Sequence, residues 1–115
     1  MLARQHRFHG YNSLAYVYKN GVSARGPLFA IKTAPNSRRQ TYRAAVVVSK
    51  KVHKSAVVRN RIRRRLYAAL GELTVGIKQP QDIIITVFND TILTESAAQL
   101  QHQLKKQLTQ AGVLV

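Results

Sequence analysis

The sequence predicts an α+β protein of one domain, with helices packed against a single central sheet. Apolar, β-branched segments typical of strands alternate with segments of helical periodicity, in the order α-β-β-α-β-α. The chain has 115 residues, and 45% of them are hydrophobic, which suits one domain with a single modest core. Because no internal repeat or linker divides the chain, we expect residues 1–115 to fold as one unit.

The first helix is predicted over residues 11–21, YNSLAYVYKNG. Its tyrosine, leucine and valine side chains recur at helical spacing along one stripe. Asn12 or Ser13 can cap the N-terminus, since a short polar side chain accepts a hydrogen bond from the first turn. At the other end Gly21 offers a left-handed stop.

Three segments have the composition of strands. Residues 28–34, LFAIKTA, lie between two prolines and predict a short strand. Residues 42–51, YRAAVVVSKK, and residues 82–89, DIIITVFN, are apolar runs typical of strands that are covered on both faces. An additional short strand is expected near residues 21–26.

Two more helices are predicted in the remaining sequence. Residues 56–70, AVVRNRIRRRLYAAL, form the second helix, which we expect Gly71 to close. The third helix follows Thr94 as its N-cap, covers residues 95–111 with a leucine-lined buried face, and ends at Gly112.

The charge of the chain is strongly one-sided. Nineteen Lys and Arg residues face four acids, and the formal net charge is +15. Sixteen of the basic residues and none of the acids fall within residues 1–71. Such a field destabilises a compact state unless a polyanion compensates it, and nucleic acid is the favoured polyanion. An anionic membrane surface is the alternative, but a membrane-surface helix typically carries tryptophan, which this chain lacks.

Five arginines within seven residues concentrate this charge on the second predicted helix. At 100° per residue an apolar stripe about 120° wide forms the core side of the helix. The stripe consists of Val58, Ile62, Leu66, Ala69 and Leu70. Arg59 and Arg65 lie at its two edges, and the residues that point away from it are Asn60, Arg61, Arg63 and Arg64. No acid lies in this helix, although mixed signs would stabilise it, so we interpret the outer face as a phosphate-binding surface.

Independent catalysis by the chain is not expected. A metal-dependent nuclease needs clustered carboxylates, and none of the four acids precedes residue 72. The four histidines show no metal-ligand spacing, and there is no cysteine. No apolar run approaches the length of about 20 residues that spans a bilayer, so a cytoplasmic protein that makes no use of a membrane is expected.

Residues 49–66, SKKVHKSAVVRNRIRRRL, resemble the signature of the protein subunit of bacterial ribonuclease P. In that signature a strand ends in Ser-Lys-Lys, and Arg-Asn-Arg opens a basic helix after a short connector. Weaker agreement covers Arg7-Phe8, the aromatic-bearing first helix and the Asp-led apolar strand. The resemblance implies an α-β-β-β-α-β-α fold with a left-handed crossover, shared with a domain of a ribosomal protein.

The resemblance also implies a function. In the family a large RNA subunit removes the 5′ leader from precursor tRNA with bound Mg²⁺, while the protein docks on that RNA and helps to hold the leader. The protein alone is then inactive, binds no cofactor of its own and is monomeric outside the complex. Carried over to this chain, the contacts to the catalytic RNA are Lys50, Lys51, Arg59, Asn60, Arg61, Arg63, Arg64 and Arg65. Those to the leader, in a cleft between the first helix and the sheet, are Leu14, Tyr18 and Lys32.

Five positions, in three segments, depart from the family pattern. Leu14 stands where an aromatic residue is expected, and Ala45 and Val47 stand where Gly and Ser are usual, which would narrow the cleft. After the last strand, Phe88-Asn89 replaces Arg-Pro. Two other functions stay open at this stage: a ribosomal or other structural RNA-binding protein, and a free-standing RNA-cutting enzyme.

Overall fold

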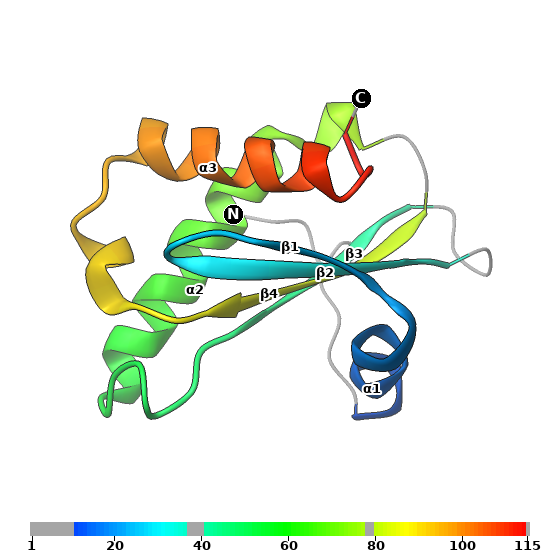
Figure 1. The fold of residues 1–115 in the computed structure, drawn as a ribbon. Coiled ribbons are helices and arrows are strands. Elements are labelled where there is room, and N and C mark those ends of the chain that lie inside the picture. The colour runs from blue at the N-terminus through cyan, green and yellow to red at the C-terminus, as the bar shows by residue number, and fades with distance from the viewer. Residues whose placement is uncertain (1–10, 37–40, 78–79, 115) are drawn as a thin grey trace.

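The computed structural model describes residues 11–36, 41–77 and 80–114. Three α-helices and four strands alternate along this part of the chain (Figure 1). The α-helices are α1 (Tyr11–Asn20), α2 (Ala56–Glu72) and α3 (Ala97–Gln110). The strands are β1 (Val22–Arg25), β2 (Phe29–Pro35), β3 (Arg43–Val47) and β4 (Gln81–Val87). Two short 3₁₀ helices, η2 (Thr74–Gly76) and η3 (Asp90–Leu93), precede and follow β4.

The strands form one mixed sheet in the order β1-β2-β4-β3. The pairs β1–β2 and β2–β4 are antiparallel, whereas β3 and β4 are parallel and are joined through α2. The additional strand expected near residues 21–26 is confirmed as β1. The order of elements is therefore α-β-β-β-α-β-α, as the resemblance implied, and the predicted α+β class is correct.

The sheet separates two layers of helix (Figure 1). On one face α2 and α3 cover the main core, where Ile83 and Ile85 of β4 are fully buried. On the other face α1 covers a smaller cluster of Val17, Ala34, Ala45 and Ile84. Alternate residues of a strand point to opposite faces, so the unbroken Ile83–Ile85 run serves both layers. We call the second face the α1 face.

Several element boundaries differ from the predictions. The second helix continues through Gly71 to Glu72, and the third is capped by Ser96, whose side chain accepts a hydrogen bond from the Gln99 amide, rather than by Thr94. The strand predicted over residues 42–51 ends at Val47, because a turn with a hydrogen bond from Val52 N to Ser49 O begins directly afterwards.

The helix stops predicted at Gly112 and Gly21 have different outcomes. Gly112 adopts a φ of 81° after α3, as expected of a left-handed helix stop. Gly21 has no positive φ, although it follows α1 directly. Helix α1 begins at Tyr11, so Asn12 and Ser13 lie inside its first turn. The predicted Arg7-Phe8 feature lies outside the described residues.

Candidate nucleic-acid interface

Helix α2 is anchored by the apolar stripe that the sequence predicted. Ile62, Leu66 and Leu70 are fully buried and Ala69 is nearly so, while Val58 at the start of the stripe is partly buried. Ser55 caps the helix, since its hydroxyl accepts a hydrogen bond from the Val58 amide. The stripe and the cap fix the rotation of α2, and the opposite side of the helix is thereby held toward solvent.

The outward side of α2 presents Asn60, Arg61 and Arg64, which are exposed. Neither Arg61 nor Arg64 makes a hydrogen bond or an ion pair within the described part of the chain. Each guanidinium group retains five N–H donors in a planar fork that matches a phosphate. We call Asn60, Arg61, Arg64, Lys50 and Lys51 the basic face.

Two of the predicted contacts, Arg59 and Arg63, bind the connector between β3 and α2. Arg59 donates to the carbonyl oxygens of His53 and Lys54, at 3.0 and 2.9 Å. Arg63 donates to the Asn60 side chain at 2.7 Å and to the carbonyl oxygen of Val48 at 3.5 Å. The connector is therefore held along the first turns of α2. Because Lys50 and Lys51 lie on this connector and are exposed, their charges extend the surface of the helix.

Arg65 has a different setting from the other arginines. It is partly buried, and its guanidinium group donates to the carbonyl oxygens of Ile92 and Glu95, in the segment between β4 and α3. These hydrogen bonds tie α2 to the start of α3. The sequence placed Arg65 at the edge of the apolar stripe, and the structure shows that this edge faces protein backbone.

The predicted leader residues lie on the α1 face of the sheet. Val17 is completely buried between α1 and the sheet, and Leu14 packs partly against the same cluster. The ring of Tyr18 is 42% exposed, so one side of it is open to a ligand. Lys32 of β2 donates to the Tyr18 carbonyl oxygen at 2.5 Å, and its ammonium group lies 5.9 Å from the centre of the Tyr18 ring.

The Lys32 ammonium group therefore has two roles, one at the end of α1 and one beside the Tyr18 ring. The Tyr18 carbonyl is in the last turn of α1, where carbonyl groups lack partners within the helix, and a cation there is favoured by the helix dipole. The contact also fixes a positive charge beside the exposed tyrosine. Lys32 therefore connects α1 to the sheet as well as facing the predicted site.

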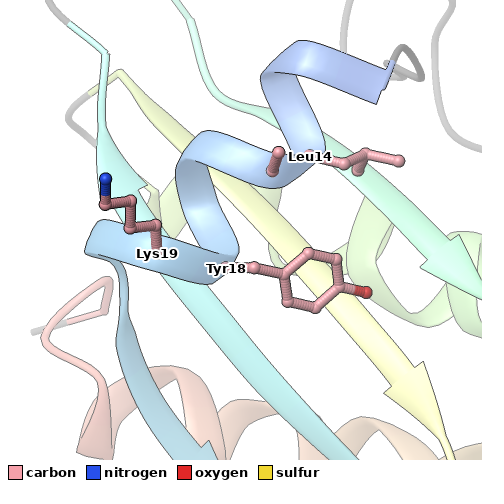
Figure 2. Close-up of a pocket in the computed structure, with 4 residues that line it drawn as sticks. Leu14, Tyr18 and Lys19 are labelled. Atoms are coloured by element: carbon pink, nitrogen blue, oxygen red, sulfur yellow. The ribbon is translucent and has the colours of Figure 1, made fainter.

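An open hollow of about 480 Å³ lies beside α1 (Figure 2). Among the described residues it is lined by Leu14, Ala15, Tyr18 and Lys19, all from α1. Leu14 and Tyr18 extend to the same side of the helix in Figure 2, as expected for residues four apart. The structure thus brings Leu14 and Tyr18 together and places Lys32 against Tyr18.

The departures in β3 have different consequences. Ala45 is buried beneath Val17, where a side chain larger than glycine contributes to the small cluster. Val47 is only partly buried and packs at the edge of this cluster, as Leu14 does. Ala45 therefore adds to the buried cluster, and Val47 adds apolar surface at its edge.

One ion pair was not expected from the sequence. Arg43 of β3 binds Asp82 of β4 through two hydrogen bonds of 2.9 Å, and Asn36 donates to the same carboxylate at 3.0 Å. These residues are 39 and 46 positions from Asp82. No local pattern could reveal the contact, which depends on the register of the parallel strands. The contact neutralises the acid of β4 on the α1 face.

Two features, a metal-binding cluster and a membrane-spanning helix, are absent from the described segments. These segments contain no group of three His, Asp or Glu side chains that could hold a metal ion together. No helix in the part of the chain that the structure describes is both long and apolar enough to cross a membrane. His6 and His9 lie outside the described residues.

The fold and this surface define a small α+β protein with an exposed cationic helix. The model of the family described as Ribonuclease P matches residues 2–112. The chain belongs to the ribonuclease P protein family, and is accordingly a protein subunit of a tRNA-processing endoribonuclease.

Relatives in bacteria support this assignment. The chain is 34% identical to the ribonuclease P protein component of Synechococcus elongatus, with 98% of this chain and 95% of the relative covered. It is 36% identical to that of a Pseudanabaena species, over 99% and 97% of the two chains.

Solved structures support the fold. The RNase P protein of Staphylococcus aureus has a TM-score of 0.82 and 26% identity, covering 96% of this chain and 98% of that one. The RNase P protein of Thermotoga maritima is similar in fold, with a TM-score of 0.79 at 18% identity over 90% and 96% of the chains. A ribosomal or other structural RNA-binding role is not favoured by these matches.

Proposed function

We propose that this chain binds the catalytic RNA of ribonuclease P through the basic face and helps to hold the 5′ leader of precursor tRNA on the α1 face. The observation that carries the proposal is the outward side of α2, where Arg61 and Arg64 are exposed and make no hydrogen bond or ion pair within the described part of the chain. Cleavage itself is carried out by the RNA subunit, in the cytoplasm.

A prearranged basic face suits RNA for a physical reason. The buried stripe holds the α2 backbone, and Arg59, Arg63 and Arg65 fix the segments on either side of it. Little backbone order then remains to be gained on binding, so more of the phosphate contact energy appears as affinity. Each neutralised phosphate also releases condensed counterions.

The leader would be an unpaired strand, and the α1 face offers what such a strand binds. Tyr18 supplies an exposed ring on which a base can stack, while Lys32 supplies a positive charge next to it. Proteins bind single strands by this combination of stacking and backbone neutralisation. Leu14, which replaces an aromatic residue, would contribute apolar contact without stacking.

No catalytic step is assigned to a metal ion held by this protein. Among the described residues, no three carboxylate or imidazole groups lie together. In the proposal Mg²⁺ acts through the RNA subunit. The protein contributes binding, and it would lower the Mg²⁺ concentration that the ribonucleoprotein needs by neutralising part of the RNA charge.

A reconstitution assay tests the proposal. The purified protein is mixed with bacterial ribonuclease P RNA and precursor tRNA at low Mg²⁺, and cleavage at the mature 5′ end is measured. We expect cleavage that exceeds that of RNA alone. Binding without any enhancement of cleavage would instead support a structural RNA-binding role. Cleavage by the protein in the absence of the RNA subunit would support a free-standing nuclease.

A matched pair of variants assigns the effect to the basic face. The double variant Arg61→Ala/Arg64→Ala should reduce the enhancement, because two unpaired cations are lost from α2. The double variant Lys105→Ala/Lys106→Ala removes the same charge from exposed positions of α3 and should leave most of the enhancement intact. Equal losses in the two variants would show that only net charge matters.

A further inference from the structure

A second exposed aromatic residue lies on the α1 face, far from Tyr18. Phe88 follows directly after β4 and is 38% exposed. The guanidinium group of Arg25, at the end of β1, lies 4.4 Å from the centre of its ring. Both side chains are on the surface, so this contact does not belong to either buried core.

The register of the sheet places this pair on the same face as the proposed leader site. Arg25 is opposite Ala30, which is opposite Thr86, and Thr86 is two residues beyond Ile84 of the α1 cluster. Phe88 is two residues beyond Thr86 and continues this alternation of faces. Val87, which lies between Thr86 and Phe88, is buried in the main core. The pair therefore lies at the far end of the surface that begins beneath α1.

The surface of the sheet between the two aromatic residues is partly exposed. Helix α1 lies at one end of the sheet, and the β1–β2 turn and the end of β4 lie at the other (Figure 1). Ala30 and Thr86, which form the floor between these ends, are small and half-buried. From Ile84, which pairs with Lys32, four residues of strand lead to Phe88, a distance of about 13 Å.

Arg25 has the chemistry of a nucleotide contact. Its guanidinium plane covers the Phe88 ring, and within the described residues its N–H groups have neither an acid nor a carbonyl as partner. A guanidinium group in this position stacks through its plane and still donates to a phosphate through its edge. An exposed ring beside it offers a stacking surface to a base.

We propose that Arg25 and Phe88 form a second platform for an unpaired nucleotide of RNA, in line with Tyr18 along the α1 face. The inference rests on the proposed leader binding and extends it. The strand from Ile84 to Phe88 spans about 13 Å, so one nucleotide does not reach both aromatic residues. The platform therefore binds a different part of the leader from the nucleotide that contacts Tyr18.

The test measures the affinity of the reconstituted ribonucleoprotein for precursor tRNAs whose leaders differ in length. With the wild-type protein, affinity should rise as the leader reaches Tyr18 and rise again when a longer leader reaches Phe88. Phe88→Ala and Phe88→Leu should both remove the second rise, about fivefold or more, and preserve the first. Phe88→Leu retains apolar packing, so an unchanged melting temperature shows that its loss of affinity is not a loss of fold.

Matched variants complete the comparison. Arg25→Ala should reduce the second rise, whereas Lys105→Ala on α3 and Val75→Ala, an exposed apolar residue of η2, should retain it. A second rise that survives both Phe88 variants would overturn the platform and leave the leader site at Tyr18 standing. A wild-type protein with no gain from any leader would overturn the leader binding itself, and the platform with it.

A spectroscopic measurement observes the platform directly. The chain contains no tryptophan, so Phe88→Trp introduces a single indole at this position. Its fluorescence should change when a long-leader precursor binds and stay constant with a short-leader one, because only the long leader reaches it. Constant fluorescence with a bound long leader would contradict the proposal.

Discussion

The arginines of α2 divide into two groups by what their guanidinium groups contact. Arg61 and Arg64 are exposed and make no hydrogen bond or ion pair within the described residues, whereas Arg59, Arg63 and Arg65 donate to backbone carbonyl oxygens. The carbonyl contacts offset part of the repulsion among the five cations. The first group is available for phosphate without breaking any contact of the fold.

The first prediction concerns this division. Arg61→Ala/Arg64→Ala should weaken binding to ribonuclease P RNA and make it less dependent on salt. Each lost phosphate contact removes about 0.7–0.9 from the slope of log affinity against log salt concentration. Titrations at several salt concentrations measure the slope, and an unchanged slope would show that these side chains do not contact phosphate.

Arg65→Ala provides the contrast within the same helix. It leaves the carbonyl groups of Ile92 and Glu95 without their donor, and such a loss costs about 1–3 kcal/mol. Its melting temperature should therefore fall clearly, whereas that of Arg61→Ala/Arg64→Ala should not. A stable Arg65→Ala protein with impaired RNA binding would show that Arg65 contacts RNA together with the basic face.

The second prediction concerns Tyr18. Tyr18→Ala removes the exposed ring beside Lys32 and should weaken binding of precursor tRNA by the ribonucleoprotein more than binding of mature tRNA. A lost base stack corresponds to about 1–3 kcal/mol. Affinities for the two tRNAs, measured side by side, give the comparison. Equal losses would exclude Tyr18 from the leader site.

At the residue scale, the sequence predicted which way a side chain points better than it predicted the groups that the side chain contacts. Helical periodicity placed Arg61 and Arg64 outward and Arg65 at an edge, and the structure agrees with all three positions. The partners of Arg65 are 27 and 30 residues away, so only the packing of α3 against α2 determines them. The same holds for the Arg25–Phe88 contact and for the Arg43–Asp82 ion pair.

At the scale of elements, the turn from α1 into β1 is unusually tight. The Gly21 amide donates to the Val17 carbonyl oxygen at 2.7 Å. A Cβ atom at Gly21 would lie 2.5 Å from that oxygen and 2.7 Å from the carbonyl oxygen of Thr33. Glycine is required here because two backbone segments approach closely, and not for a left-handed conformation.

The third prediction follows from this turn. Gly21→Ala should lower the melting temperature and also displace α1 from the sheet, because neither backbone oxygen can yield as a flexible side chain would. The discrimination between precursor and mature tRNA should then decrease, while binding to the RNA subunit through α2 persists. Gly112→Ala is the comparison at a glycine with open space and a positive φ, and it should affect stability alone. Full precursor discrimination by Gly21→Ala would separate the turn from the leader site.

The sequence predicted which helices and strands are present, but it predicted less well the residues at which they begin and end. Runs such as residues 82–89 combine β-branched residues in a way that only a buried strand accommodates, and β4 lies there. The end of α2 at Glu72 depends instead on hydrogen bonds from Leu73 to carbonyl groups of the last turn, which a glycine at position 71 does not prevent. Ser96 and Thr94 have similar capping chemistry, but Thr94 ends η3 and its hydroxyl donates to the Thr91 carbonyl oxygen, so Ser96 caps α3.

At the scale of the molecule, one observation dominates: a net charge of +15 on 115 residues. A single ion pair, Arg43–Asp82, occurs within the described segments. Uncompensated repulsion of this kind destabilises the compact state, and salt screens it over about 10 Å at 0.1 M. The same charges promote RNA binding, which salt weakens.

The fourth prediction is that salt has opposite effects on the stability of the free protein and on its affinity for RNA. Between about 0.05 and 0.5 M NaCl the melting temperature of the free protein should rise, while its affinity for RNA falls. Arg61→Ala/Arg64→Ala should show a smaller rise, since two repelling charges are gone. Thermal unfolding followed by circular dichroism measures the first effect. A melting temperature that does not respond to salt would show that repulsion contributes little.

The position of β4 in the sheet has a consequence for how the chain is made. Strand β4 lies between β2 and β3, yet it is the last of the four to be synthesised. During translation β3 has no strand to pair with until residues 81–87 emerge. By then all sixteen basic residues of the first 71 positions have left the ribosome. The nascent chain therefore exposes all of residues 1–71, the polycationic segment, before the sheet is complete. A nearby RNA can then bind this segment while it is unfolded.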